Sequence, residues 1–247
     1  MKEALLADIG NTNTKVVFYS NGKMREIRRS SALDALGFIR GVLKKEGKEM
    51  DLIVVSNVRC KNAPIKEALA PFCKRLVVLD NKTPLPVDLK YGFDATELGA
   101  DRIASALAVA CLFPGKDCIK FEFGTALTVD FIDKEGRYLG GNISLGMRSR
   151  FRALKDYTGL LPYITPDPQF PPIGVTTTGA MSAGIVYGLL FEVEGYIKRY
   201  PEHQIIFSGG DAEYMAKRIT QDVYVAQEMV LKGLAFIADY YIKKDEN

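Results

Sequence analysis

The chain has 247 residues, of which 47% are hydrophobic and 26% charged, as in a globular protein with room for two domains. Its 33 basic and 30 acidic residues leave a net charge of +3, which disfavours nucleic acid and membrane surfaces as partners. A single histidine disfavours a histidine-based triad or zinc site, and four cysteines without a Cys-x-x-Cys pair indicate reduced core residues of a cytosolic protein. We expect neither a signal peptide nor a membrane helix, since no apolar run approaches about 18 residues.

The opening stretch, residues 5–23, places Asp8 at the end of an apolar run and follows it with a turn at Gly10-Asn11-Thr12. A β-branched and aromatic run and an Asn21-Gly22 turn come next, so the pattern predicts a hairpin. Glycine lets backbone approach a ligand closely, and the neighbouring amides and hydroxyls can line a phosphate. A carboxylate beside such a turn commonly handles a metal ion or its water. An ordinary hairpin that carries an acid and a glycine is the alternative for this stretch alone.

The remainder of the first half reads as a third strand followed by helix, strand, helix and strand. We expect these elements at Met24–Arg29, 30–43, Asp51–Val58, Asn62–Ala70 and Lys74–Asp80. This order is the plan of one ribonuclease-H-like half. An alanine-rich helix from Ile103 to Phe113 ends at Pro114-Gly115, so we place a domain boundary there and expect domains at 1–116 and 117–247.

The opening hairpin is repeated from Phe121 onwards. A gap-free shift of 114 residues superposes Asp8 on Glu122, Gly10 on Gly124, Thr14 on Thr128, Gly22 on Gly136 and Lys23 on Arg137. This match favours an internal duplication over chance similarity. Two related halves, each with an acid and a Gly/Thr turn, suggest a phosphate that is held from two sides.

The second half continues with a mixture of strands, helices and one proline-rich segment. We expect strands within Ile119–Asp133, at Tyr138–Ile143, at Gln204–Phe207 and near Val223–Ala226, helices at 144–162, Gly179–Tyr200 and Glu228–Lys243, and an extended loop at Thr165–Pro172. Gly184 and Gly188 on the long helix are compatible with close helix packing, including packing across a dimer. Gly209-Gly210 after a strand is a geometry of nucleotide contacts, with a left-handed turn as the alternative.

Six motifs stand in one order along nearly the whole chain. They are Asp8-Ile9-Gly10-Asn11-Thr12, Glu97-Leu98-Gly99-Ala100-Asp101-Arg102, Gly124-Thr125-Ala126, Gly140-Gly141-Asn142-Ile143, Gly174-Val175-Thr176-Thr177 and Ser208-Gly209-Gly210-Asp211. In this order they resemble the type III pantothenate kinase family. The E-x-G-x-D-R motif between two phosphate motifs is not general among sugar kinases or actin-like ATPases.

The resemblance implies a fold, an activity and a set of cofactors. The fold would be α/β, with two duplicated ribonuclease-H-like domains of the actin-like type, each with a mixed five-stranded sheet. The activity would be ATP-dependent phosphorylation of pantothenate to 4′-phosphopantothenate, the first step of coenzyme A synthesis, in the cytoplasm. A divalent cation such as Mg²⁺ and a monovalent K⁺ or NH₄⁺ would take part. The protein would be a homodimer with its interface in the second domain.

The resemblance also assigns roles by position. Asp101 would be the general base, which suits a phosphoryl transfer that depends on positioning and on one carboxylate to accept the hydroxyl proton. The residues expected to bind ATP are Asp8, Ile9, Gly10, Asn11, Thr12, Asn13, Thr14, Lys15 and Thr125. The residues expected to bind pantothenate are Tyr91, Gly99, Ala100, Asp101 and Arg102, with Thr177 reaching it from the other subunit. For an arbitrary helix, a solvated acid–base pair would be the alternative reading of Asp101 and Arg102.

Glu122 departs from the family pattern, which usually has aspartate there as the ligand of the monovalent cation. The extra methylene moves the carboxylate by about an ångström or more. Lys120 precedes Glu122 by two residues and therefore shares its strand face, so it or Arg102 could offset the glutamate charge. We expect a weaker dependence on potassium than in the family, and a return of that dependence in Glu122→Asp.

Two alternatives to a pantothenate kinase stay open at this point. One is a non-catalytic regulatory protein of the same fold, because some relatives are named as accessory factors for virulence-gene transcription. The other is a different small-molecule phosphotransferase or phosphohydrolase of the superfamily. Asp8, Asp101 and Arg102 favour catalysis, and an ADP-release assay with and without pantothenate separates the three.

Overall fold

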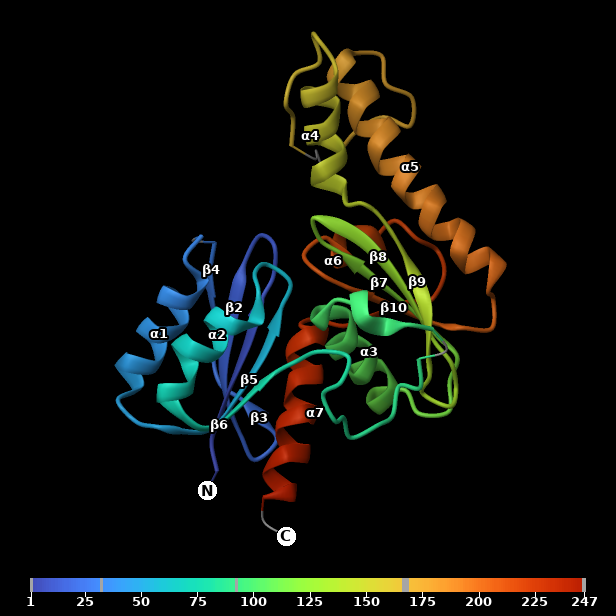
Figure 1. Ribbon diagram of the computed structural model, residues 1–247. Coiled ribbons are helices and arrows are strands. Elements are labelled where there is room, and N and C mark those ends of the chain that lie inside the picture. Colours follow the sequence, from blue (N-terminus) through green and yellow to red (C-terminus); the bar gives the residue numbers. More distant parts are fainter. Residues whose placement is uncertain (1, 32, 92, 166–168, 246–247) are drawn as a thin grey trace. The chain divides into compact units, whose positions relative to one another are not determined.

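The computed structural model describes residues 2–31, 33–91, 93–165 and 169–245, and the chain forms two compact units (Figure 1). The first unit comprises Met1–Pro114, Glu135–Tyr138 and Glu228–Asn247. The second comprises Gly115–Lys134 and Leu139–Gln227. The predicted domain boundary at 116/117 stays a prediction.

The first unit contains a mixed sheet with the order β3-β2-β1-β5-β6, and a further strand, β4, also pairs with β2. Strand β1 is antiparallel to β2 and parallel to β5. The strands are β1 (Ala4–Ile9), β2 (Thr14–Ser20), β3 (Lys23–Met24), β4 (Arg28–Ser30), β5 (Met50–Asn57) and β6 (Cys73–Val78). The third strand, expected as one element at Met24–Arg29, is therefore two short strands, which is why this sheet has six strands rather than five.

The first sheet is covered on both faces, as the alternation along β1 requires. Leu5, Ala7 and Ile9 pack with α1 (Ala35–Glu46) and α2 (Asn62–Leu69) in one hydrophobic core. On the opposite face, α7 (Met229–Lys244) contacts β1 and β5, and α3 (Ala100–Leu112) contacts β5. Figure 1 shows α1 and α2 on one side of this sheet and α7 on the other.

Two local expectations in the first unit need correction. Helix α1 begins after Asp34, whose side chain accepts a hydrogen bond from the Gly37 amide at 2.7 Å, and Leu33 is 95% exposed instead of starting the apolar helix face. The predicted helix start at Ser30 is wrong, because Ser30 ends β4, and Ala32 lies outside the described residues. Cys60 is exposed rather than buried, although all four cysteines are free thiols as expected.

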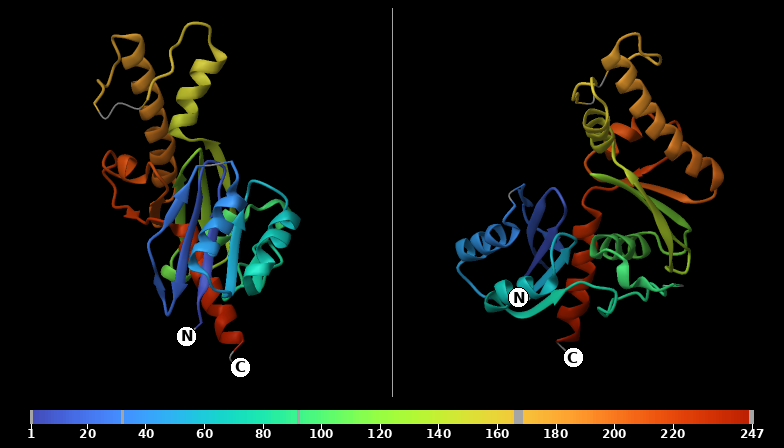
Figure 2. Two further views of the ribbon diagram at one scale, coloured as in Figure 1. Left: turned by 90° about the vertical axis from the view of Figure 1, so that its left-hand side faces the viewer. Right: turned by 45° about the horizontal axis from the view of Figure 1, so that its top comes forward.

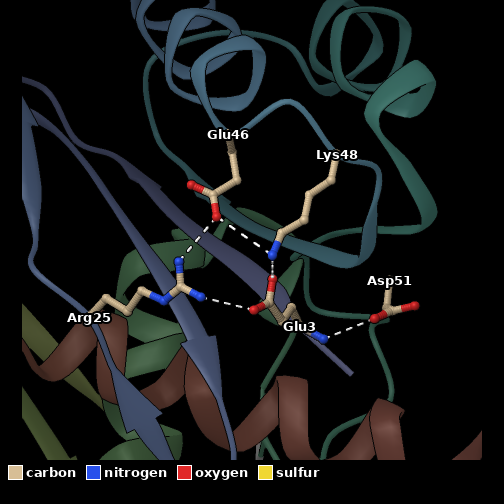
Figure 3. Close-up of polar contacts among 5 residues, drawn as sticks. All are labelled: Glu3, Arg25, Glu46, Lys48 and Asp51. Atoms are coloured by element: carbon tan, nitrogen blue, oxygen red, sulfur yellow. Dashed lines mark hydrogen bonds and ion pairs between the residues drawn. The ribbon is translucent and has the colours of Figure 1, made fainter. Parts of the chain in front are cut away.

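An ion-pair network fixes the amino end of β1, the end of the strand that does not lead into the Gly10-Asn11-Thr12 turn (Figure 3). Glu3 accepts a hydrogen bond from Arg25 at 2.9 Å and also pairs with Lys48. Arg25 donates to Glu46 at 3.1 Å, and the Glu3 amide donates to Asp51 at 2.9 Å. Arg25 lies just after β3, and its amide still donates to the Phe18 carbonyl of β2 at 2.9 Å, so the interruption between β3 and β4 lies beyond Arg25.

The second unit repeats the plan of the first. Its sheet has the order β9-β8-β7-β10-β11, so the third, second, first, fourth and fifth strands follow each other as in the first sheet. The strands are β7 (Cys118–Phe123), β8 (Ala126–Ile132), β9 (Tyr138–Leu145), β10 (Gln204–Ser208) and β11 (Tyr224–Val225). This common order confirms the predicted α/β fold with two duplicated, mixed sheets.

The described part of the second unit contains three helices, α4 (Met147–Tyr157), α5 (Thr177–Arg199) and α6 (Ala212–Ala216). Figure 2 shows α5, in orange, running alongside the sheet, and its apolar residues share a core with β7, β8 and β10. Residues 166–168 of the predicted proline-rich loop lie outside the described residues. Among the described residues, one helix is long and apolar enough to cross a membrane by length and composition alone, since an 18-residue part of α5 reaches a mean hydropathy of 1.2. Half of that part is buried, and core helices of globular proteins pass the same test.

Helices α3 and α7 occupy corresponding places in the repeat, each after the fifth strand of its half, and they pack against each other in the first unit. A Cβ atom at Gly233 would lie 1.9 Å from the Ala104 carbonyl oxygen, so only glycine allows this crossing. The close crossing explains why α7, which topologically closes the second half, is compact with the first unit.

Candidate active site

The turn between β1 and β2, residues 10–13, presents polar groups at the end of β1. We call it the phosphate turn. The Gly10 amide donates to the Asn13 carbonyl at 3.0 Å, and the side chains of Asn11, Thr12 and Asn13 are exposed. Asp8, only 7% exposed, lies just before the turn. The turn therefore brings backbone amides and a threonine hydroxyl to the surface, and such groups can line a phosphate. Ile9 and Thr14 are completely buried, so any contact they make with a ligand falls to their backbone.

Asp8 lies in a row of polar residues that crosses three strands. It is paired with Lys15 on β2 and with Ser56 on β5, and directly opposed residues share a sheet face. Mg²⁺ commonly takes one or two protein carboxylates and completes its shell with phosphates and water, so a single buried aspartate beside a phosphate turn fits it. The described residues contain no cluster of three or more histidine, cysteine or acidic side chains suited to a metal.

Glu228 holds the basic side of this row in place. Its carboxylate accepts hydrogen bonds from Lys15 at 2.8 Å and from Arg29 at 2.5 Å. Burial alone would raise the pKa of Glu228, but the hydrogen bonds and charges of the two cations hold that pKa below its ordinary value. Glu228 has a φ of 58°, a left-handed conformation that costs a residue with a side chain about 1–2 kcal/mol, so the ion pairs maintain a strained position.

Arg59 binds the phosphate turn from the loop after β5, and sequence reasoning missed it. Its guanidinium donates to the Gly10 carbonyl at 3.0 Å and to the Asn11 carbonyl at 3.3 Å. Asn57 shapes the loop by accepting from the Arg59 amide at 3.1 Å. The available signal was a basic residue just after a buried strand, the same position that drew attention to Asp8.

Asp101 is placed by the start of α3. Gly99 is the N-cap residue, and one Asp101 carboxylate oxygen accepts from the Arg102 amide at 2.8 Å. A Cβ atom at Gly99 would lie 2.7 Å from that oxygen and 3.5 Å from a methyl group of Val58. Val58 is the neighbour of Arg59, so the helix start that carries Asp101 packs against the loop that holds the phosphate turn.

Tyr91 and Arg102, two residues predicted to bind substrate, both contact Tyr138. The rings of Tyr91 and Tyr138 meet edge to face at 6.2 Å, and the Arg102 guanidinium lies 5.9 Å from the Tyr138 ring centre. Burial raises the pKa of Tyr91 to about 12, and its hydroxyl has no hydrogen-bond partner among the described residues. Tyr138 comes from the short segment 135–138 that joins the first unit, which sequence spacing alone could not reveal.

The second unit gathers three loops at the carboxyl end of its own sheet. The Gly124 amide donates to the Ala126 carbonyl at 3.0 Å, and the Thr125 carbonyl accepts from the Gly146 amide at 3.0 Å and from Ser149 at 2.6 Å. Thr125, the residue expected to contact ATP here, is exposed. Thr177 is the first residue of α5 rather than part of the preceding loop.

The Gly-Gly turn after β10 completes this edge. Gly209 has a φ of 96° and would clash with the Phe123 backbone if it carried a Cβ. A turn with positive φ, the alternative for this segment, therefore occurs there, and a helix opens after it. The nucleotide contact stays a prediction. Asp211 lies 3.7 Å from Arg148, which lowers its pKa, but burial has the larger effect and raises the pKa of Asp211 overall.

The two turns correspond, but not in the gap-free register that the sequence suggested. Asp8 is paired with Lys15 and Ser56, whereas Glu122 is paired with Thr128 and Ser208. The second turn is therefore one residue shorter, and Thr128 corresponds to Lys15 rather than to Thr14. Matching of hydroxyl residues misled the alignment, because strand pairing, not residue type, sets the register.

Solved structures of other proteins share the overall fold of this chain. A protein described as a Baf family transcriptional activator from Campylobacter jejuni aligns with a TM-score of 0.64 at 19% identity, covering 97% of this chain and 99% of that one. The activator of 2-hydroxyisocaproyl-CoA dehydratase from Clostridium difficile, with bound ADPNP, aligns with a TM-score of 0.59 at 16% identity over 99% and 97% of the two chains. The fold is that of the actin-like ATPases and the phosphotransferases related to them.

Sequence comparison identifies one family among the proteins with this fold. The model of the type III pantothenate kinase family matches residues 4–199. Type III pantothenate kinases of Phocaeicola vulgatus and Bacteroides fragilis are 36% and 34% identical to this chain, over 96% of it and 98% and 97% of their own lengths. The chain belongs to the type III pantothenate kinase family.

Proposed function

We propose that this protein transfers the γ-phosphoryl group of ATP to pantothenate, which forms 4′-phosphopantothenate and opens coenzyme A synthesis in the cytoplasm. Family membership supports the reaction. The proposed roles of the residues are supported by one observation. Arg59 contacts the Gly10 turn, and Val58, the neighbour of Arg59, lies beside the helix start that holds Asp101, although these segments are far apart in the sequence.

Asp101 is the general base in this proposal. Its carboxylate takes the proton of the pantothenate hydroxyl, the oxygen attacks the γ-phosphorus, and ADP leaves. The Gly10 turn and Lys15 bind the ATP phosphates, and Arg59 fixes the turn by holding its carbonyl groups. Asp8 would hold Mg²⁺, which neutralises phosphate charge when bound. Thr125 would also contact ATP.

The pantothenate contacts follow from the Tyr91–Tyr138–Arg102 group. Arg102 is a suitable partner for the substrate carboxylate because its guanidinium offers charged donors in a fixed geometry. The buried Tyr91 hydroxyl gains a hydrogen-bond partner when a polar substrate enters.

We further propose a homodimer in which Thr177 reaches the substrate of the other subunit. An apolar groove of about 410 Å³ runs along α5 beside Gly184, Gly188 and Phe191, and Phe191 is 66% exposed. Small residues four apart allow two helices to approach closely, so a second copy of α5 fits this groove. With 33 basic and 30 acidic residues, we expect neither nucleic acid nor membrane as a partner.

A coupled ADP-release assay, with and without pantothenate, tests the reaction. Pantothenate-dependent release supports the proposal. ADP release that does not depend on pantothenate would indicate another phosphotransferase or a phosphohydrolase. The absence of ADP release with every cation tested would indicate a regulatory protein of this fold.

A further inference from the structure

Strand β7 carries a buried charge on the face opposite its core. Ile119, Phe121 and Phe123 enter the hydrophobic core of the second unit, and Lys120 and Glu122 point the other way. The Lys120 ammonium lies 3.0 Å from a Glu122 carboxylate oxygen, and only 1% of Lys120 is exposed.

A second carboxylate contacts the same ammonium. Asp130 is paired with Lys120 across β7 and β8, lies 3.5 Å from its nitrogen and is completely buried. Charged groups lose several kcal/mol of solvation on burial, so such a cluster is rarely retained for stability alone.

The duplicated first unit shows that the fold does not need these charges. Because Asp8 corresponds to Glu122, the positions of Lys120 and Asp130 correspond to Leu6 and Val17, which are paired across β1 and β2. Both are apolar and buried. The ammonium and its second carboxylate are therefore particular to the half that carries Glu122, two residues before the Gly124-Thr125 turn.

The residues at Glu122 do not fit the potassium or ammonium ion that the family resemblance implies there. One oxygen of the Glu122 carboxylate already contacts the Lys120 ammonium, and a second cation on the same carboxylate would be repelled by that ammonium. Lysine itself presents an alkylammonium, which carries the same charge as K⁺ or NH₄⁺.

We propose that Lys120 is a built-in replacement for the monovalent cation. Its ammonium, held by Glu122 and Asp130, supplies the positive charge beside the Thr125 turn, and phosphoryl transfer proceeds without added potassium. This inference rests on the proposed kinase reaction for its kinetic test, but cation binding itself can be measured without turnover.

The kinetic test compares initial rates in K⁺, NH₄⁺ and Na⁺ at constant ionic strength. The unmodified protein should vary by less than about twofold between them, since screening is held constant. Lys120→Met should be slower in Na⁺ by roughly tenfold or more, and K⁺ or NH₄⁺ should restore its rate in a saturable way. Lys134→Met, which removes an exposed lysine just after β8, is the matched control and should behave like the unmodified protein.

Melting temperature supplies the second readout. Potassium or ammonium should raise that of Lys120→Met above its value in sodium and leave that of the unmodified protein unchanged. If Lys120→Met alone fails to fold because Asp130 loses its partner, the double variant Lys120→Met/Asp130→Asn removes that charge and retains Glu122 for the ion.

Two outcomes would overturn the proposal. One is saturable activation or stabilisation of the unmodified protein by potassium. The other is a folded Lys120 variant that no cation activates or stabilises, which would make the lysine purely structural. If the protein does not phosphorylate pantothenate at all, the melting temperatures still decide whether Lys120 replaces a cation.

Discussion

A methyl group added at Gly99 should displace the proposed base without disturbing the fold. Gly99 has φ −60° and ψ 140°, which alanine adopts freely, so the backbone is not strained. The new Cβ would lie 2.7 Å from the Asp101 carboxylate oxygen, whereas non-bonded heavy atoms prefer about 3.5 Å, so the carboxylate must move by roughly 0.5–1 Å. A displacement of about 1 Å at a catalytic group can cost 10²-fold, and we expect Gly99→Ala to lower kcat by about 10- to 100-fold.

The assay is coupled ADP release at saturating ATP and pantothenate, together with melting temperature. Stability should change little, because the carboxylate that must move is the end of a flexible side chain. Gly41→Ala is the control, since a Cβ on this residue of α1 meets no atom within 4 Å and alanine favours a helix. A kcat for Gly99→Ala within about twofold of the unmodified protein would refute the reasoning.

Combining substitutions sharpens this test. In an Asp101→Asn background, Gly99→Ala should cost nothing further, because it acts only by displacing the base. A full additional loss in the double variant would show that Gly99 acts on the substrate instead.

Three further outcomes are expected. Asp101→Asn should retain ATP binding and folding but lower turnover by about 10²–10⁴-fold, and near-normal turnover would exclude it as the base. Mixing Asp101→Asn with Thr177→Val subunits should restore about a quarter of full activity, because half the dimers contain one intact shared site, and a monomer in light scattering would contradict this. Glu228 has a depressed pKa in the folded chain, so its stabilisation is present above its unfolded value of 4.5 and is lost as the pH falls below it. The unfolding free energy of Glu228→Gln should therefore depend less on pH in this range, and an unchanged acid profile in urea titrations would count against the Lys15 and Arg29 pairing.

Most of the fold was predictable because it depends on local patterns. The buried strand at β5, the helix at α2 with Pro64 in its first turn, and the long helix at α5 all appear where apolar periodicity placed them. The exceptions are local. The third strand divides into β3 and β4, an interruption that the residue pattern of this segment did not indicate.

Residues of the candidate site could be predicted where they belong to a sequence motif. Residues that reach the site only through a long-range contact could not be predicted. Asp8, Gly10 and Asp101 belong to recognisable motifs, and their functional roles stay proposals. Arg59 and Glu228 contact the same region from outside those motifs, and only folding brings them to the turn.

The packing of α7 in the first unit has a consequence for synthesis. A ribosome makes the whole second unit before it makes Glu228 and α7. In a nascent first half, one face of the sheet therefore lacks α7 and keeps only its contact with α3 at β5, and Lys15 and Arg29 lack the Glu228 carboxylate. Nascent domains usually fold from the amino terminus onwards, but here the phosphate turn cannot reach its final setting until α7 is translated. We therefore expect nascent chains that stop before Glu228 to require protection from aggregation, even though every residue of the turn has already been made.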